Sequence, residues 1–227
     1  GRAQVARNAL LTGMKLGLIG VGGMGRPMGE HLLAAGHQLA VWSRRPDAAE
    51  ALLALGASRA ATPQELAAGC EIVCTNVTGG ADVAGLAEQF VDVLAPDSIH
   101  LDFSTIAPSV ARAIAARYAA RDIHFVDAPV SGGTTAAQAA TLAIMWGGKS
   151  ALAARLDPLF RCLGKAIVRV GEAGAGQVAK SCNQLVMVAA IEACAEGARL
   201  ARAAGIDFGK VRTALLAGSA ASRVLDV

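Results

Sequence analysis

A lysine near the start of an apolar helix is the residue whose type and position most directly suggest chemistry. The stretch GAGQVAKSCNQ (Gly174–Gln184) runs from glycines into a predicted helix that carries Lys180 in its first turns. At about 100° per residue, Lys180 shares a face with Met187 and Ile191, while Glu192 lies on a different face. Burial and the helix dipole both disfavour a protonated amine there, so we expect a lowered pKa, suited to a general acid or base. The helix alone is equally consistent with a lysine whose stem packs on an apolar surface.

A glycine-rich stretch from Lys15 to His37 is the second candidate. Gly20, Gly22 and Gly25 form the pattern G-x-G-x-x-G between a predicted strand and a predicted helix, which is the context that dinucleotide binding requires. The first glycine permits a tight turn, the second lets backbone approach a pyrophosphate, and the third lets the helix pack on the strand. A glycine turn without a ligand is the alternative. The predicted cofactor-binding residues here are Gly20, Val21, Gly22, Gly23, Met24 and Gly25.

The residues after the second predicted strand indicate which dinucleotide binds. NAD sites place an acid at this point, but the sequence reads VWSRRPD, and Asp47 comes only after a proline. A hydroxyl and two guanidiniums suit a 2′-phosphate, so we expect Ser43, Arg44 and Arg45 to favour NADPH over NADH. The alternative is that both arginines are ordinary solvated residues.

Two further turns follow predicted strands. FVDAPVSGG ends in Ser131, Gly132 and Gly133, whose hydroxyl and N–H groups can hold a carboxylate. DFSTIAP is expected to project Ser104 and Thr105 into the same crevice, because ligands of open α/β sheets collect at the carboxyl ends of strands.

The elements that must position these residues follow a βαβαβ pattern. Continuous apolar runs predict strands at 15–19, 38–42, 72–75, 98–102, 124–128, 142–145 and 166–170, and TPQE (62–65) is a capping box that opens a helix. We therefore expect an α/β fold with a Rossmann-type, doubly wound, mostly parallel sheet, followed by the start of an all-α domain. The predicted parts are an extension at 1–13, expected to be poorly ordered, an NADP-binding domain at 14–174 and an incomplete helical domain at 175–227. The last part opens with a long helix at about 177–204, and a second helix begins near Phe208.

Composition sets broad limits on the function. The 227 residues are 54% hydrophobic with a net charge of +3, and the sequence lacks a basic block that would indicate nucleic-acid binding. The longest apolar run of the long helix, Leu185–Ile191, is shorter than the roughly 20 residues that a span needs, so no membrane partner is expected. The five cysteines and four histidines fit neither a disulfide framework nor a metal site, which favours a cytoplasmic protein without a metal.

Taken in order, the three motifs resemble those of the β-hydroxyacid dehydrogenase family, which includes 3-hydroxyisobutyrate dehydrogenase and tartronate semialdehyde reductase. GVGGMGRPM resembles its cofactor motif, FVDAPVSGG its substrate motif and GAGQVAKSCNQ its catalytic motif, and the resemblance covers roughly 14–227. It implies an NAD(P)-dependent oxidoreductase that transfers hydride between NADPH and a small β-hydroxy acid or its semialdehyde.

The resemblance also implies roles for individual residues. Lys180 corresponds to the catalytic general acid or base, and Asn183 to an asparagine that helps to hold a small carboxylate-bearing substrate. Ser131, Gly132 and Gly133 correspond to the carboxylate-binding turn. Val77, Thr78 and Thr105 correspond to positions that line the nicotinamide end. Family members form dimers and tetramers, so a homo-oligomer is expected.

The sequence departs from the family at two points. Ala136 and Ala140 stand where the family has glycines, which is tolerated in a helix but not readily at positive φ. Family members also continue beyond the point that matches Val227, with helices and a further lysine near the substrate. Two other interpretations stay open: an imine reductase, although those enzymes generally lack a lysine at this position, and a non-catalytic dinucleotide-binding scaffold.

Overall fold

The computed structural model describes residues 13–226, so the predicted extension at 1–13 lies outside the described residues except for Gly13. The chain divides into two compact units, 1–180 and 181–227. The strands are β1 (Lys15–Ile19), β2 (Gln38–Trp42), β3 (Ser58–Arg59), β4 (Ile72–Thr75), β5 (Ile99–Asp102), β6 (His124–Asp127), β7 (Val130–Ser131), β8 (Leu142–Gly147) and β9 (Gly164–Gly171). The helices are α2 (Gly25–Ala34), η1 (Pro46–Ala49), α3 (Glu50–Ala54), α4 (Pro63–Ala68), α5 (Gly80–Phe90), α6 (Pro108–Ala119), α7 (Gly133–Gln138), η2 (Ser150–Leu152), α8 (Ala153–Leu163), α9 (Ala175–Ala203), α10 (Phe208–Leu216) and α11 (Arg223–Asp226).

The first unit is built on a nine-stranded sheet with the order β3-β2-β1-β4-β5-β6-β8-β7, and β9 pairs with β8. The strands from β3 to β6 are all parallel, whereas β8 runs antiparallel to both β6 and β7. The order 3-2-1-4-5-6 is that of dinucleotide-binding Rossmann folds, in which the order of the parallel strands reverses at β1 and continues outward again from β4. The predicted doubly wound, mostly parallel sheet is therefore confirmed.

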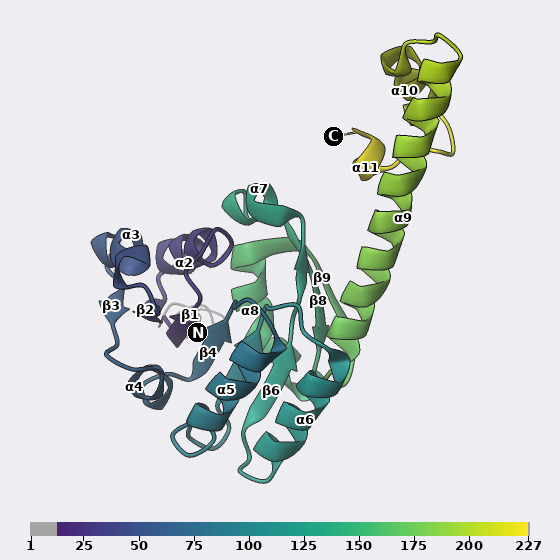
Figure 1. Ribbon diagram of the computed structural model, residues 1–227. Helices are drawn as coiled ribbons and strands as arrows, with labels where there is room; N and C mark the ends of the chain where they lie inside the picture. The colour runs from purple at the N-terminus through teal and green to yellow at the C-terminus, as the bar shows by residue number, and fades with distance from the viewer. Residues whose placement is uncertain (1–12, 227) are drawn as a thin grey trace, which may run out of the picture. The chain divides into compact units, whose positions relative to one another are not determined.

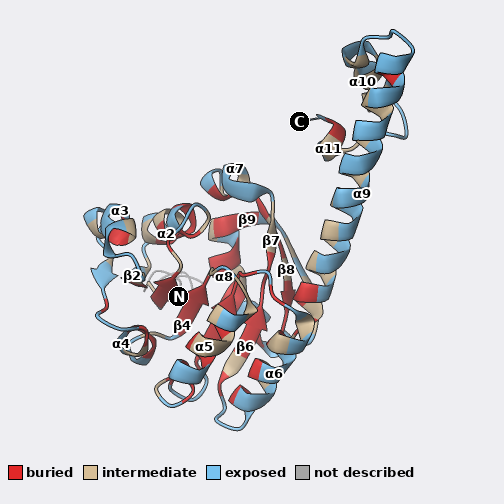
Figure 2. Ribbon diagram, viewed as in Figure 1, coloured by how far each residue is buried: buried red, intermediate tan, exposed pale blue. Residues whose placement is uncertain are grey.

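Helices cover both faces of this sheet (Figure 1). One core cluster joins the sheet to α2, α3 and α8, and the other joins it to α4, α5 and α6. Figure 2 shows the strands of this unit as largely buried between the two helical layers. Continuous apolar strands such as Ile72–Thr75, buried at every position, are the expected consequence of covering both faces.

The capping box at the start of α4 illustrates how local sequence fixes an element. The Thr62 hydroxyl accepts a hydrogen bond from the Glu65 N–H at 3.0 Å, and Pro63 occupies the first turn. The Glu65 carboxylate accepts from the Ala61 N–H at 2.8 Å, one residue before the cap. The helix begins where the sequence predicts, because side chains satisfy N–H groups that have no partner within the helix.

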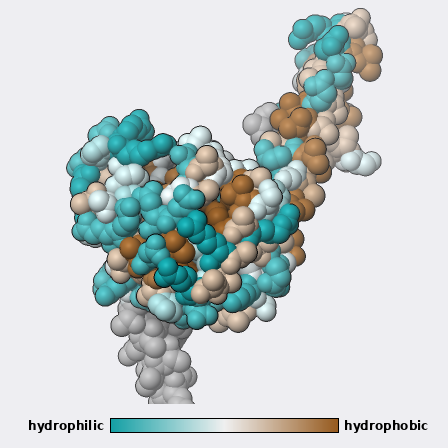
Figure 3. Space-filling view, turned by 60° about the horizontal axis from the view of Figure 1, so that its bottom comes forward, coloured by the Kyte–Doolittle hydropathy of each residue, from teal (hydrophilic) through white to brown (hydrophobic). Residues whose placement is uncertain are grey.

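The second unit consists of the C-terminal part of α9 together with α10 and α11. Asp207 caps α10 by accepting from the Gly209 N–H at 3.0 Å, and the Arg212 guanidinium donates to the Leu225 carbonyl at 2.6 Å. Large apolar side chains of α9 are exposed, as Figure 3 shows for the surface of this unit. By length and composition alone, α9 with its 29 residues is also long and apolar enough to cross a membrane.

Candidate active site

The glycine loop after β1 has the geometry that its spacing predicts. Gly20 has a φ of 98°, in the region that favours glycine. A Cβ atom at Gly20 would lie closer than 3.0 Å to the Asn76 carbonyl, and one at Gly25 would lie as close to the carbonyl of Gly20. A Cβ at Gly22, in contrast, would meet no atom within 4 Å. Gly20 and Gly25 therefore allow close backbone packing within the turn. Gly22 leaves open space above the backbone, which fits a pyrophosphate at the start of α2.

A groove of about 860 Å³ lies over this loop. Of the predicted cofactor-binding residues, only Thr105 does not line it. The others that do are Gly20, Val21, Gly22, Gly23, Met24, Gly25, Ser43, Arg44, Arg45, Val77 and Thr78. These residues follow β1, β2 and β4, which are adjacent in the sheet, so the groove sits at the switch point of the strand order. It is also lined by Trp42, Pro63, Asn76, Asp82 and Gln89, which the motifs did not single out.

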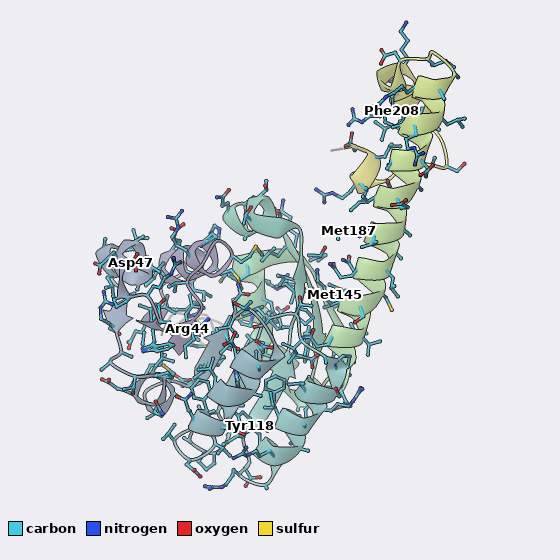
Figure 4. All side chains as sticks on the ribbon, in the orientation of Figure 1. Arg44, Asp47, Tyr118, Met145, Met187 and Phe208 are labelled. Atoms are coloured by element: carbon cyan, nitrogen blue, oxygen red, sulfur yellow. The ribbon has the colours of Figure 1, made fainter. Side chains whose placement is uncertain are left out.

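The end of the groove after β2 carries both the predicted arginines and a carboxylate. The Arg44 guanidinium lies 3.5 Å from the Asp82 carboxylate of α5, and the side chain of Arg44 is largely exposed whereas that of Asp82 is half-buried. The Ser43 hydroxyl accepts from the Arg45 N–H at 3.3 Å, which orders the start of this loop. Figure 4 shows Arg44 and Asp47 in the same part of the molecule. A 2′-phosphate bound here would compete with Asp82 for Arg44.

The predicted substrate turn lies beside the glycine loop. Ser131 ends β7, and Gly132 and Gly133 have φ values of 125° and 65°, so both glycines adopt a backbone that other residues avoid. A Cβ at Gly23 would lie 3.4 Å from the Thr134 methyl group. The structure thus brings the cofactor and substrate motifs together, although they are far apart in the chain.

The two alanines that replace family glycines have different outcomes. Ala136 lies inside α7, where alanine is a favourable residue. Ala140 has a φ of 52°, so its methyl group is held in the left-handed region. The departure at Ala140 therefore stores backbone strain just after α7.

The expectation for Ser104 is wrong. Ser104 is only 2% exposed and does not project into the groove. Its hydroxyl accepts from the Val77 N–H at 2.9 Å and donates to the Asp102 carboxylate at 2.6 Å, so the strand-end network consumes both of its hydrogen-bonding functions. The neighbouring Thr105 is exposed.

Lys180 belongs to the first unit and lies in the second turn of α9. Desolvation by partial burial lowers its pKa from the ordinary value, in the direction that the sequence predicts. The start of α9 is held by Asp127, whose carboxylate accepts from the N–H groups of Gly174 at 2.6 Å and Gln177 at 2.8 Å. Asn183, one turn after Lys180, donates from its side chain to the Gln184 side chain at 3.0 Å.

Comparison with known families decides what these motifs belong to. Residues 15–171 match the NAD binding domain of 6-phosphogluconate dehydrogenase, and residues 174–227 match the NAD-binding domain of NADP-dependent 3-hydroxyisobutyrate dehydrogenase.

The chain belongs to the β-hydroxyacid dehydrogenase family.

Individual relatives agree with this assignment. The 2-hydroxy-3-oxopropionate reductase of Escherichia coli is 39% identical over 94% of this chain and 74% of its own length. The NAD-dependent L-serine dehydrogenase of Pseudomonas aeruginosa is 37% identical over 85% of this chain and 66% of its own length. A solved Mycobacterium tuberculosis 3-hydroxyisobutyrate dehydrogenase with L-serine is 31% identical, with a TM-score of 0.89 over 93% of this chain and 73% of that one. The chain thus spans about two thirds to three quarters of the length of these family members.

The resemblance to imine reductases is confined to the fold. A Myxococcus stipitatus imine reductase has a TM-score of 0.82 but only 22% identity. Within residues 13–226, no group of three or more His, Cys, Asp or Glu side chains could hold a metal ion, and all five cysteines are free.

Proposed function

We propose that the protein is an NAD(P)-dependent oxidoreductase that acts on a small β-hydroxy acid or its semialdehyde. The observation that carries the proposal is the single groove that collects the glycine loop, the arginine loop and residues Val77 and Thr78 at the switch point of the sheet. A nicotinamide dinucleotide held there supplies or accepts the hydride. The family membership supports the same reaction class.

Lys180 is the proposed catalytic residue. In the reducing direction its ammonium group gives a proton to the substrate oxygen, and in the oxidising direction its neutral amine takes that proton back. Desolvation lowers the pKa of Lys180, which is the direction that favours the neutral amine and so supports a role as a base. Ser131, Gly132 and Gly133 are proposed to hold the substrate carboxylate through a hydroxyl and N–H groups, and Asn183 to assist them.

Replacing Lys180 with alanine tests this role. We expect kcat to fall by roughly 10²–10⁴-fold, the range for loss of a general acid or base, while the Kd for NADPH stays within about twofold. Lys165→Ala, at an exposed lysine of β9, is the matched control. A Lys180→Ala variant with near-normal kcat contradicts the mechanism, and a wild-type protein that binds dinucleotide without turnover on any semialdehyde supports the scaffold interpretation.

The substrate class is a small carboxylate-bearing molecule. Relatives named for 2-hydroxy-3-oxopropionate and L-serine support this class, because each of these molecules combines a carboxylate with a nearby oxygen function. The experiment is NADPH oxidation with tartronate, succinic and methylmalonate semialdehydes and with glyoxylate. Measurable turnover with only one of them identifies the substrate.

We propose a preference for NADP over NAD. Ser43, Arg44 and Arg45 line the groove where the 2′-phosphate of NADPH would lie, and no carboxylate of β2 or of the residues directly after it lines the groove. Ser43→Asp combined with Arg44→Gln is expected to reverse the ratio of kcat/KM values for NADPH and NADH. An unchanged ratio contradicts the assignment.

We also propose that the protein is a cytoplasmic homo-oligomer, a dimer or tetramer, with neither nucleic acid nor membrane as a partner. The exposed apolar side chains of α9, including Leu185 (72%), Val186 (71%) and Leu200 (73%), support burial against another chain. The same helix carries Glu192 and Glu196, whose charges favour a protein partner over lipid. Sedimentation equilibrium tests the assembly, and recovery of the protein in the membrane fraction of cells contradicts the proposed location.

A further inference from the structure

A row of polar side chains lies at the carboxyl ends of three neighbouring strands. Thr75 of β4 is in register with Asp102 of β5, which is in register with Asp127 of β6. All three side chains are fully buried. Because the strands are parallel, this row lies at the same edge of the sheet as the glycine loop.

The loop after β5 is joined to the cofactor groove through this row. Asp102 accepts from the Thr75 hydroxyl at 2.8 Å and from the Ser104 hydroxyl at 2.6 Å. The Ser104 hydroxyl in turn accepts from the N–H of Val77, which lines the groove. The position of loop 104–106 is therefore tied to the segment proposed to lie at the nicotinamide end.

The same loop is joined to α9 by Gln177. This side chain is 1% exposed. Its amide N–H donates to the Ser104 carbonyl at 2.8 Å, and its amide oxygen accepts from the Ile106 N–H at 3.0 Å. One side chain thus satisfies a carbonyl and an N–H of the loop at once, which only a group with both a donor and an acceptor can do.

The first turn of α9 is fixed from other sides as well. The Asp127 carboxylate accepts from the backbone N–H groups of Gly174, just before α9, and of Gln177, in its first turn, and so caps the start of the helix. A Cβ at Gly176 would lie 2.5 Å from the Met145 carbonyl and 2.7 Å from the Asp127 carbonyl, so the helix backbone packs directly on the strand ends. Lys180 follows Gln177 by three residues, which is about one turn.

We infer that Gln177 is a positioning residue that sets the distance between the Lys180 amine and the cofactor groove, through its paired hydrogen bonds to loop 104–106. The inference rests on the proposed function of Lys180. The connection runs from Val77 to the Ser104 hydroxyl, along the Ser104 backbone, through the Gln177 amide and one turn up α9. Each hydrogen bond joins elements that are far apart in the sequence, so the bridge fixes one part of the site against the other.

The test is Gln177→Leu in the full chain, with Gln38→Leu at the exposed start of β2 as the matched control. Misplacement of a reacting group by about 1 Å can cost about 100-fold in rate, so kcat is expected to fall by about 10–100-fold in Gln177→Leu. The Kd for NADPH stays within about twofold, because the groove-lining residues are unchanged. A larger primary isotope effect with NADPH deuterated at C4 is expected as hydride transfer becomes rate-limiting.

Gln177→Glu provides the second variant. A neutral carboxyl group offers one donor and one acceptor, as the amide does, whereas the ionised form offers only acceptors. The introduced carboxyl would lie against the Ser104 carbonyl and the Ile106 N–H. The charged and titratable groups around it are Asp127, bound to the backbone N–H of residue 177, Asp102 behind Ser104, Arg112 beside Gly174 and Lys180 one turn on. The kcat of this variant relative to wild type is therefore expected to rise as pH falls from 8.5 to 6. A ratio that stays constant with pH overturns the inference.

Hydrogen–deuterium exchange separates this inference from the proposed function. In Gln177→Leu the amides of 174–180 and 104–106 are expected to exchange about tenfold faster, while those of β1 and α2 are unchanged. If no semialdehyde is reduced by the wild type, the proposed function fails, but the exchange result still reports on the bridge. A Gln177→Leu protein with unchanged exchange, or with kcat within about twofold of wild type, overturns the positioning role.

Discussion

Replacing Asp102 with asparagine is expected to change how the stability of the protein depends on pH. Asp102 is fully buried, and burial raises its pKa to about 7 from the ordinary 3.8, with the nearby Asp127 adding in the same direction. Its Oδ1 accepts three hydrogen bonds from Thr75 and Ser104, whereas Oδ2 has no hydrogen-bond partner among the described residues. Asparagine keeps the acceptor and cannot ionise.

The sign and size of the effect follow from these pKa values. Between pH 3.8 and 7 the folded state holds a proton on Asp102 that the unfolded state has released. Raising the pH in this range therefore favours unfolding, and the effect levels off once both states are ionised. A shift of about 3 units corresponds to about 4 kcal/mol over the whole range, of which about 2–3 kcal/mol falls between pH 5 and 8.

Neighbouring titratable groups do not account for the expected difference between the two proteins. His100 reaches the Thr75 hydroxyl at 2.9 Å, but burial lowers its pKa to about 3, so it stays neutral throughout. Asp127 has a pKa raised to about 6 by burial, against the hydrogen bonds from Gly174 and Gln177, and it titrates in both proteins. The difference between variant and wild type therefore isolates Asp102.

The assay is urea unfolding at pH values from 5 to 8, with the free energy of unfolding extrapolated to water. Relative to wild type, the free energy of unfolding of Asp102→Asn is expected to rise by about 2–3 kcal/mol from pH 5 to pH 8, whatever the difference in stability between the two proteins at pH 5. Asp47→Asn, at an exposed carboxylate, is the control and is expected to run parallel to wild type. Parallel curves for Asp102→Asn would refute the reasoning.

Three further predictions concern the groove and the substrate turn. Gly22→Ala is expected to keep its melting temperature and to lose dinucleotide affinity by at least about tenfold in fluorescence titrations, because its methyl group meets only open space, whereas Gly25→Ala is expected to lose both. Asp82→Asn is expected to tighten binding of 2′-phosphorylated adenosine nucleotides by a few-fold without changing that of their unphosphorylated counterparts, since it releases the paired arginine, and equal effects on both contradict this. Ala140→Gly is expected to raise the free energy of unfolding by about 0.5–1 kcal/mol, because relief of the positive φ outweighs the added chain entropy, while Ala139→Gly, at a φ of −87°, lowers it.

The strands of the first unit were predictable because their apolar runs are continuous and separated by helical segments. Every predicted strand is present, with ends that differ by at most two residues. The two-residue strands β3 and β7 were not predicted, because so short a run has no pattern of its own. The antiparallel course of β8 was not predicted either, since the sequence of a buried strand does not encode its direction.

The residues of the site likewise fall into those that the sequence predicted and those that it did not. The cofactor groove was predictable because its residues fall in short motifs directly after strands, and parallel strands bring such ends together. Ser104 was assigned wrongly because its hydroxyl is used inside the strand-end network instead of facing the groove. Asp127 lies within the substrate motif, but its role at the start of α9 gave no signal in the sequence.

The sequence by itself determined the turn at Gly20, the cap at Thr62, the apolar strands and the family, because each depends on residues close together in the chain or on a short motif. Only the tertiary structure decided that Thr75, Asp102 and Asp127 form one buried row, and that Gln177 reaches loop 104–106 across separations of 71 and 73 residues. The physical reason is that backbone preference and burial act over a few residues, whereas the choice of a distant partner depends on strand order and register, which the whole fold fixes at once.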